Sequence, residues 1–394
     1  MELRAPQLGD RSLFPDLAAR AYLAHAAVSP VSSRVAQAVH RCLSDYAQRG
    51  VAAAIDMARL RADARALAAQ LLHANSSEIG LVQSTSAGVI AIARSLPFLP
   101  KQRVIVFEGE FPANFTPWQL VARDLGLELV SLPLAAFLRS DEEGLALLRG
   151  ELERGARLVA VSAVQFQTGL RMPLKSMAEL CHAHGAELFV DAIQALGVVP
   201  LDVKELGIDY LAAGGHKFMM GLEGAGLLYV RNECLPALSL GLAGWTGHED
   251  AFSFLMDDQA GQLRYDRPLV RATTFVEQGA VSMVGYAALS ASLQMLLELG
   301  VSSIFDHVAH YLDSLEPALL ALGLTSVRAR ERARQSAILA FKLPPGPALT
   351  QVARRLGEQG IVVSTPDGHL RLAPHFANHI SEIPAVVLAV QRAL

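Results

Sequence analysis

Short apolar segments alternate with helix-like ones in the first half of the chain, and this alternation limits the folds that the chain can adopt. Strands are expected at residues 104–107, 127–132, 158–162 and 188–190, and helices at 118–126 and 173–184. Strands separated by helices of this length are joined by right-handed crossovers and form a mainly parallel sheet covered on both faces. The first half of the chain is therefore predicted to be α/β.

The last hundred residues have a different pattern, which predicts a smaller α+β domain. Strands are expected at 336–341, 361–364 and 369–372, and a helix at 348–359. A helix without charged residues around 280–297 is expected to link this part to the first. We therefore predict a large domain over 20–275 and a small domain formed by 1–19 and 276–394.

Only 18% of the 394 residues are charged and 52% are hydrophobic, against about 25% charged residues in typical soluble domains. The longest stretch without charge, between Glu277 and Glu298, contains Gly285, Ser290 and Ser292, which suits a buried helix better than a membrane span. We expect no membrane partner. The apolar excess instead suits a surface buried against a second copy, so a homodimer is predicted.

The net charge of −4 provides no basic field for nucleic acid. The three cysteines, Cys42, Cys181 and Cys234, are odd in number, far apart and without metal-ligand spacing, as expected in a reducing cytoplasm. No metal site is expected: His375 and His379 have helical ligand spacing, but Pro374 and the loop character before them argue against zinc.

The segment 188–217 carries the most chemical information. Asp191 and Gln194 follow the strand 188–190, and His216 and Lys217 lie at the end of the segment. Open α/β sheets bind ligands at the carboxyl ends of their strands, and a carboxylate buried there needs a cation or hydrogen-bond donors. Glycines around Lys217 would let a planar ligand approach, and a lysine with a lowered pKa forms Schiff bases. The alternative is a structural Asp–Lys ion pair, which leaves His216, Gln194 and the glycines without a role.

The Asp-x-x-Gln pair followed downstream by Gly-His-Lys resembles the fold-type I PLP enzymes of the class V aminotransferase family. That family includes cysteine desulfurases, kynureninase and isopenicillin-N-epimerase-like proteins. The resemblance implies pyridoxal 5'-phosphate (PLP) as the cofactor, bound by Lys217 as a Schiff base. It further implies that Asp191 keeps the pyridine nitrogen protonated, that Gln194 bonds the phenolic oxygen, and that His216 contacts the phosphate or orients the lysine.

Two upstream segments extend this resemblance. Thr85 and Ser86, with the amide of Ala87, resemble the family's phosphate-binding turn, because free N–H groups at the start of a helix bind anions. Taken alone, the segment would be interpreted as only a helix N-cap. Phe111 occupies the position of the aromatic residue that stacks on the cofactor ring, although an ordinary core phenylalanine is the alternative. Asn114 is a further candidate for holding the phosphate or the ring.

The chain ends supply the substrate candidates. The segment around Arg371 resembles the family's Arg-x-Ser-Pro-His-Phe-x-Asn motif, so Arg371 is the candidate clamp for a substrate carboxylate, because guanidinium offers a bidentate fork. The alternative is a surface arginine on an edge strand. His25 lies in a segment that resembles the one lining the substrate mouth, which makes it a possible substrate contact.

The chain departs from the family pattern at three places. Gly214 stands where desulfurases have a serine or threonine, and Ala280 replaces the threonine expected to reach the neighbouring subunit's phosphate. Losing two hydroxyls predicts a cofactor that is held more weakly or differently, because each hydrogen bond contributes roughly 0.5–1.5 kcal/mol. The segment 363–369 contains no cysteine, so desulfurase activity is not expected.

The resemblance thus implies a cytoplasmic, homodimeric PLP enzyme that acts on an α-amino acid or small amine. The amine would displace Lys217, which would then transfer the α-proton while Asp191 supports the ring. Transamination is expected first, and a C–S lyase or epimerase is the alternative. A non-catalytic binding subunit that keeps the PLP fold is the second alternative, since both phosphate hydroxyls are lost. Substrate identity stays open at this point.

Overall fold

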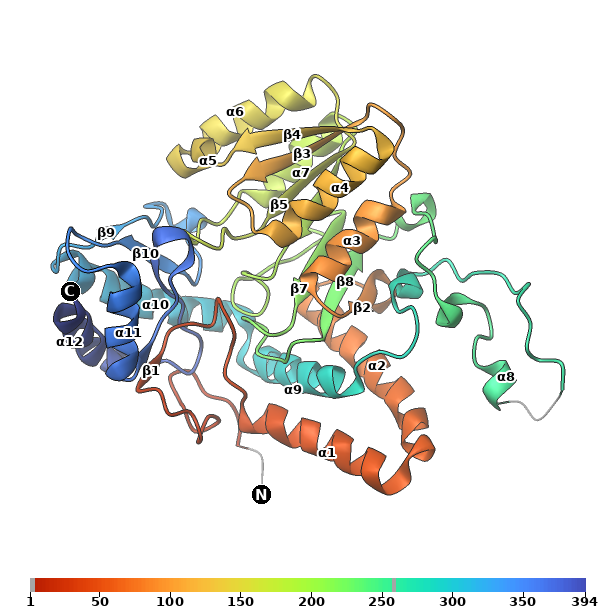
Figure 1. The fold of residues 1–394 in the computed structure, drawn as a ribbon, viewed down its shortest axis with the longest axis horizontal. Helices are drawn as coiled ribbons and strands as arrows, with labels where there is room; N and C mark the ends of the chain where they lie inside the picture. Colours follow the sequence, from red (N-terminus) through yellow and green to blue (C-terminus); the bar gives the residue numbers. More distant parts are fainter. Residues whose placement is uncertain (1–3, 257–259) are drawn as a thin grey trace.

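The computed structural model describes residues 4–256 and 260–394. Residues 1–3, assigned above to the small domain, lie outside the described part. At the centre is a seven-stranded sheet with the order β2-β8-β7-β6-β5-β3-β4 (Figure 1). The strands are β2 (Ile79–Val82), β3 (Arg103–Glu108), β4 (Glu128–Pro133), β5 (Leu158–Ser162), β6 (Glu187–Asp191), β7 (Tyr210–Gly214) and β8 (Gly226–Val230).

Strands β3 to β7 pair in parallel, whereas β8 runs antiparallel to both of its neighbours, β7 and β2. The prediction of a mainly parallel α/β sheet is therefore confirmed. The expected strands correspond to β3, β4, β5 and β6. Strands β2 and β8 were not expected from the sequence, and the apolar run before Lys217 forms β7.

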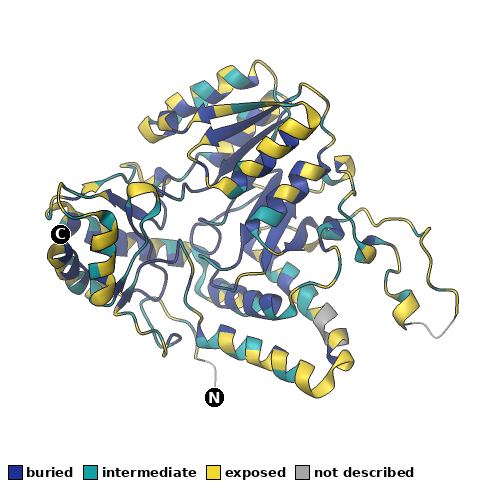
Figure 2. Cartoon of the chain, viewed as in Figure 1, coloured by how far each residue is buried: buried dark blue, intermediate teal, exposed yellow. Residues whose placement is uncertain are grey.

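Both faces of the sheet are buried because successive side chains of a strand point to opposite sides. In β5, Val159 and Val161 join one apolar core, and Leu158 and Ala160 join the other. Figure 2 shows the strands buried between helices whose outer faces are exposed. The helices over this sheet include α3 (Thr85–Ser95), α4 (Thr116–Leu125), α5 (Ala135–Arg139), α6 (Asp141–Leu152) and α7 (Leu174–Ala183).

Near the N-terminus lie two long helices, α1 (Ser33–Arg49) and α2 (Val51–Leu72). Gly50 separates them and has a φ of 53°, a left-handed conformation that glycine adopts without strain. Both helices pack against α9 (Met283–Leu299), whose apolar residues are buried on most sides. The charge-free stretch is therefore a buried helix of the core.

The C-terminal part contains α10 (Val301–Leu320), β9 (Thr325–Ser326), β10 (Leu339–Lys342), α11 (Leu349–Glu358), β11 (Ile361–Val362), β12 (Leu370–Leu372) and α12 (Ile383–Ala393). Three of its strands form an antiparallel sheet in the order β12-β10-β9. Near the other end of the chain, β1 (Ala21–Tyr22) pairs in parallel with β11. The N-terminal segment therefore lies against the C-terminal part (Figure 1). The exact domain boundaries remain a prediction.

Between β8 and α9 the chain extends away from the body as an arm that carries α8 (Ser253–Met256) (Figure 1). Figure 2 shows that much of this arm is exposed. The large apolar residues exposed on it are Trp245, Phe252, Phe254, Leu255, Leu263 and Tyr265. Among the described residues, no single helix is long and apolar enough to cross a membrane. Helices α9 and α10 pass that test only as a pair, and the chain bends by 77° between them.

Candidate active site

A cavity of about 400 Å³ gathers most of the predicted site residues. They come from segments far apart in the sequence, because the carboxyl ends of β6 and β7 meet the start of α3 and the C-terminal sheet. The lining consists of Ala26, Ala27, Ser84, Thr85, Ser86, Phe111, Ala113, Phe166, Asp191, Ile193, Gln194, His216, Lys217, Pro366 and Arg371.

Asp191 ends strand β6, so the backbone of the sheet fixes the position of its carboxylate. One oxygen, Oδ1, accepts a hydrogen bond from the Ile193 amide at 3.0 Å. Burial raises the pKa of Asp191, the nearby Glu110 raises it further, and Lys217 opposes this shift. A cationic partner beside such a buried carboxyl group stabilises its charged form.

Glu110 is a buried carboxylate beside this site to which the sequence analysis assigned no role. Its Oε1 accepts hydrogen bonds from the Ser162 amide at 2.7 Å and from Gln165 Nε2 at 3.1 Å, and its Oε2 accepts one from Ser162 Oγ. Ser162 is the register partner of Asp191 across β5 and β6. Burial raises the pKa of Glu110, and the donated hydrogen bonds oppose this. In the sequence, only its position directly before Phe111 points to it.

Lys217 follows β7 and is directed into the cavity. Burial lowers the pKa of its ammonium, the Arg371 charge lowers it further, and Asp191 acts against both. The Lys217 Nζ atom lies 5.4 Å from the centroid of the Phe111 ring. Phe111 in turn makes an edge-to-face contact with Phe166, at 5.3 Å between centroids. A buried amine whose pKa is lowered toward neutrality is a nucleophile suited to Schiff-base formation.

The start of α3 forms another wall. Ser84 is the N-cap, and its Oγ accepts a hydrogen bond from the Ala87 amide at 3.1 Å. The prediction that the Ala87 amide binds phosphate is thereby corrected, since the cap already uses that group. The amides of Thr85 and Ser86 precede the first intrahelical bond, from Gly88 to Ser84, and so remain available to an anion. Thr85 Oγ1 accepts from the Gly214 amide at 2.9 Å, which leaves its hydroxyl proton for a ligand.

Arg371 lies in β12 and is buried at the cavity. Its Nε donates to Ser364 Oγ at 2.9 Å and its Nη1 donates to the Phe166 carbonyl at 2.6 Å. In the described part of the chain it has no carboxylate within ion-pair distance. Burial lowers the pKa of its guanidinium to about 10. A buried guanidinium that neutral acceptors hold in place is ready to pair with an anionic ligand.

Gln194 and His216 complete the wall. Gln194 Nε2 donates to the Ala26 carbonyl at 3.0 Å, and the amide keeps a second hydrogen on Nε2 for a ligand. Its Oε1 is buried without a hydrogen-bond partner in the described part of the chain. Burial and the neighbouring Lys217 lower the pKa of His216, which favours its neutral form.

Besides Ala87, two predicted site residues lie outside the lining of this cavity. His25 was expected at the substrate mouth, but it is buried behind the cavity wall, where Nδ1 lies 2.8 Å from Ser29 Oγ. The lining residues are instead its neighbours Ala26 and Ala27. Asn114 is also buried outside the lining and accepts a hydrogen bond from Trp118 Nε1 at 3.3 Å. A direct contact of either side chain with a ligand in this cavity does not fit these positions.

The departures from the family pattern also have a place in the structure. Cys42, Cys181 and Cys234 are buried, and none of them lines the cavity. Ala280 lines a neighbouring cavity, together with Ala87 and Ile90 of α3. Within the described residues, no group of three or more His, Cys, Asp or Glu side chains could hold a metal ion.

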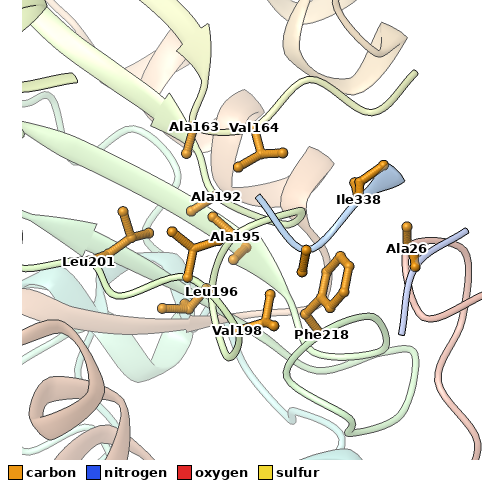
Figure 3. Close-up of a cluster of buried hydrophobic side chains, with 14 of the residues drawn as sticks. Ala26, Ala163, Val164, Ala192, Ala195, Leu196, Val198, Leu201, Phe218 and Ile338 are labelled. Atoms are coloured by element: carbon orange, nitrogen blue, oxygen red, sulfur yellow. The ribbon is translucent and has the colours of Figure 1, made fainter. Parts of the chain in front are cut away.

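The donor set fits PLP. Asp191 supplies a carboxylate for the pyridinium, Lys217 an amine for the aldehyde, Gln194 an amide hydrogen for the phenolic oxygen, and the start of α3 free amides for the phosphate. Gln194 Oε1 is a buried polar atom of this lining that has no hydrogen-bond partner among the described residues. The cavity adjoins the apolar core: Figure 3 shows Ala192 and Phe218, each adjacent in sequence to a lining residue, and the lining residue Ala26 in one buried cluster.

Comparisons with known proteins agree with this chemistry. The family model "Aminotransferase class-V" matches residues 21–382. The Bacillus subtilis (strain 168) protein named "Uncharacterized aminotransferase YcbU" is 28% identical, over 95% of this chain and 94% of that protein. A cysteine desulfurase of Klebsiella pneumoniae (strain 342) is 30% identical, over 82% of this chain and 76% of its own length.

Two solved structures share the fold. A mutant of the C–S lyase C-DES, with glycine covalently linked to its PLP cofactor, superposes with a TM-score of 0.88 at 22% identity, over 97% of this chain and 99% of that one. The cysteine desulfurase CsdA of Escherichia coli superposes with a TM-score of 0.84 at 26% identity, over 97% of each chain. The family match spans the residues that build the cavity, and the predicted cofactor is confirmed. The chain belongs to the class V aminotransferase family of PLP-dependent enzymes.

Proposed function

We propose that this enzyme is an aminotransferase that acts on a small α-amino acid, with Lys217 as the residue that binds PLP and moves the α-proton. The observation that carries the proposal is the convergence of Lys217, Asp191 and Arg371 on one cavity. The three side chains supply an amine, an acid for the ring nitrogen and a cation for the substrate carboxylate.

PLP supplies an electron sink for the substrate's α-carbon when it is bound. The residues of this chain then have separate tasks. Asp191 holds a proton at the ring nitrogen, and Arg371 orients the substrate through its carboxylate. The Lys217 amine would take the substrate's α-proton and return it, and the position of that return would distinguish transamination from racemisation.

The residues that line the cavity also indicate which kind of substrate side chain it can hold. Arg371 and Lys217 are the cationic lining residues, and the remaining surface near them is formed by Phe111, Phe166 and Ala27. A second carboxylate on the substrate would meet no additional cation there. The proposal therefore commits to an amino acid with a small, uncharged side chain.

A C–S lyase is the second candidate. It is supported by the relatives that are named cysteine desulfurases and by the shared fold with a cystine C–S lyase. A lyase that releases its sulfur product needs no thiol of its own, whereas a desulfurase that retains sulfur does. The lining of this cavity contains no cysteine. Elimination with release of product thus fits the site, and sulfur transfer to the enzyme does not.

One experiment separates these candidates. The purified, PLP-loaded protein is incubated with single amino acids and with cystine, and the products are identified by mass spectrometry. A keto acid together with aminated cofactor, and regeneration by a second keto acid, supports the aminotransferase. Pyruvate with a thiol or persulfide product supports the lyase. Return of the starting amino acid with an exchanged α-hydrogen and inverted configuration would identify an epimerase and contradict both.

We further propose that the enzyme is a homodimer whose arm packs on the second copy. The support is the row of exposed apolar side chains on the arm, which include Leu263 and Tyr265. The cavity beside Ala280 is lined by residues of α3, the helix whose first residues line the proposed PLP site, so a partner seated there would lie near the phosphate end. A cluster of large exposed apolar side chains is typical of surfaces that bind another protein.

A further inference from the structure

The N-terminal segment around Ser29 contacts the backbone of the catalytic lysine. The Ser29 amide donates to the His216 carbonyl at 2.8 Å, and Ser29 Oγ donates to the Lys217 carbonyl at 2.7 Å. The next carbonyl along, that of Phe218, lies 3.0 Å from His375 Nε2. Three consecutive carbonyls of the lysine loop are thus held by two residues from the opposite ends of the chain.

The hydrogen bonds define the protonation of both histidines involved. His375 Nδ1 accepts from the Phe376 amide at 2.8 Å, so Nε2 carries the proton and donates to the Phe218 carbonyl. The hydroxyl of Ser29 has one proton, which it donates in the hydrogen bond to the Lys217 carbonyl. The contact with His25 therefore requires Nδ1–H of His25 as the donor. Burial lowers the pKa of both histidines, that of His375 to about 3, so each stays neutral.

The same segment is fixed on its other side to the strand that carries the carboxylate clamp. The Ala373 amide donates to the Leu23 carbonyl at 2.7 Å, and the His25 amide donates to the Ala373 carbonyl at 3.1 Å. Ala373 follows Arg371 by two positions. A short path of backbone hydrogen bonds therefore joins the substrate clamp to the lysine loop.

The lysine loop also has little room to move. Gly197 has a φ of 101°, and a Cβ atom at this position would lie 2.4 Å from the Phe218 carbonyl oxygen. Lys217 O accepts a second hydrogen bond, from the Met220 amide at 2.8 Å, and Met220 has a φ of 58°. The tight turn after Lys217 thus depends on partners outside the loop to keep its carbonyls oriented.

We propose that Ser29 and His375 are positioning residues that set where the Lys217 amine points in the cavity. They touch neither cofactor nor substrate, and they act by fixing the carbonyls on either side of the Lys217 side chain. His25 acts one step further back, by orienting the Ser29 hydroxyl. The inference rests on the proposed function for its catalytic meaning, but the arrangement itself is a property of the protein without ligand.

The main test uses the apoprotein, so that it does not depend on turnover. An amine-acylating reagent labels Lys217 across a pH series, and mass spectrometry of the peptide gives the midpoint of labelling. Ser29→Ala is expected to move this midpoint upward by about half a pH unit or more, because a loosened lysine becomes more hydrated and its pKa rises. Ser29→Thr keeps the hydroxyl and should restore the original midpoint.

A second pair tests the other contact independently. His375→Gln places an amide donor near the position of Nε2 and should keep the midpoint, whereas His375→Leu removes the donor and should shift it upward. Ser32→Ala is the matched control: it removes a buried hydroxyl that caps α1 and does not contact the lysine loop. It should lower the melting temperature and leave the midpoint unchanged.

In the PLP-loaded enzyme, Ser29→Ala should lower kcat by about tenfold while KM changes by less than about twofold, as expected for misplacement of a catalytic group. An unchanged labelling midpoint in both Ser29→Ala and His375→Leu would overturn the inference, and so would an equal shift in Ser32→Ala. If wild-type Lys217 is not the residue that borohydride fixes to PLP, the proposed function fails instead. The labelling result would still stand, so the two failures are distinguishable.

Discussion

The Lys217 Nζ atom lies 5.4 Å from the centroid of the Phe111 ring, within the range of a cation–π contact. Phe111 is 45% exposed, which is high for phenylalanine, and its ring forms part of the cavity wall. The amine of Lys217 and the aromatic residue expected to stack on the cofactor are therefore adjacent in the protein without ligand. A planar ring that reacts with Lys217 arrives beside the Phe111 face.

Replacement of this lysine gives the most direct prediction. Lys217→Ala should abolish turnover and should leave no PLP covalently attached after borohydride reduction, because no other lysine lines the cavity. The measurement is peptide mass spectrometry of the reduced protein. Lys175→Ala, which changes an exposed lysine on α7, is the matched control and should retain the adduct. An adduct of equal yield in Lys217→Ala would contradict the assignment.

The buried carboxylate Asp191 predicts a dependence of stability on pH. Its pKa is raised in the folded apoprotein, so the stability that this group contributes is present below the unfolded pKa of 3.8 and is lost as the pH rises through the higher folded value. Asp191→Asn should therefore stabilise the apoprotein at pH 8 by roughly 2–4 kcal/mol relative to wild type, and little at pH 4.

Denaturant unfolding of both apoproteins at the two pH values measures this difference. Bound PLP places a cationic ring nitrogen beside the carboxylate, so the same comparison with PLP should reverse in favour of wild type. A pH-independent difference between wild type and Asp191→Asn would show that the Asp191 charge is compensated within the apoprotein.

Replacement of Arg371 by lysine separates the effect of the positive charge on substrate binding from the effect of the guanidinium geometry. Arg371→Lys keeps a cation but loses the fork that Ser364 and Phe166 orient, so KM for an α-amino acid should rise by about 10- to 100-fold. An amine without a carboxylate should show no such rise. The exposed Arg354, which pairs with Glu358 on α11, is the matched control, and Arg354→Lys should leave KM unchanged. Equal KM values for both substrate classes in Arg371→Lys would exclude the clamp.

The arm predicts an effect on assembly. Leu263 and Tyr265 are 58% and 86% exposed, and a charge at both positions in Leu263→Glu/Tyr265→Glu should weaken dimerisation by at least about tenfold. Size-exclusion chromatography with light scattering over a concentration series measures this. Leu99→Glu introduces a charge at another exposed leucine, in the loop before β3, and should not change the oligomeric state. Dimers of unchanged affinity in the double variant would place the interface elsewhere.

The sequence was most informative where the chemistry is local. Asp191 and Lys217 each follow a short apolar segment, and the carboxyl ends of neighbouring strands meet at one edge of the sheet, so their encounter could be predicted. Ser84 was overlooked because the residues after it carried the resemblance, although a serine just before an apolar helical run is itself a cap signature. Glu110 was overlooked because nothing local shows that Ser162 and Gln165 would surround it.

The sequence by itself determined the alternation of strands and helices, the family and the cofactor, because apolar periodicity and short motifs depend on neighbours along the chain. The tertiary structure alone decided that β8 is antiparallel, that His25 faces the protein interior, and that Ser29 binds the carbonyl of a residue 188 positions away. A hydrogen bond between such distant groups depends on the direction of each donor and acceptor within the fold. Periodicity indicates which residues are buried, but not which partner each buried polar group will meet.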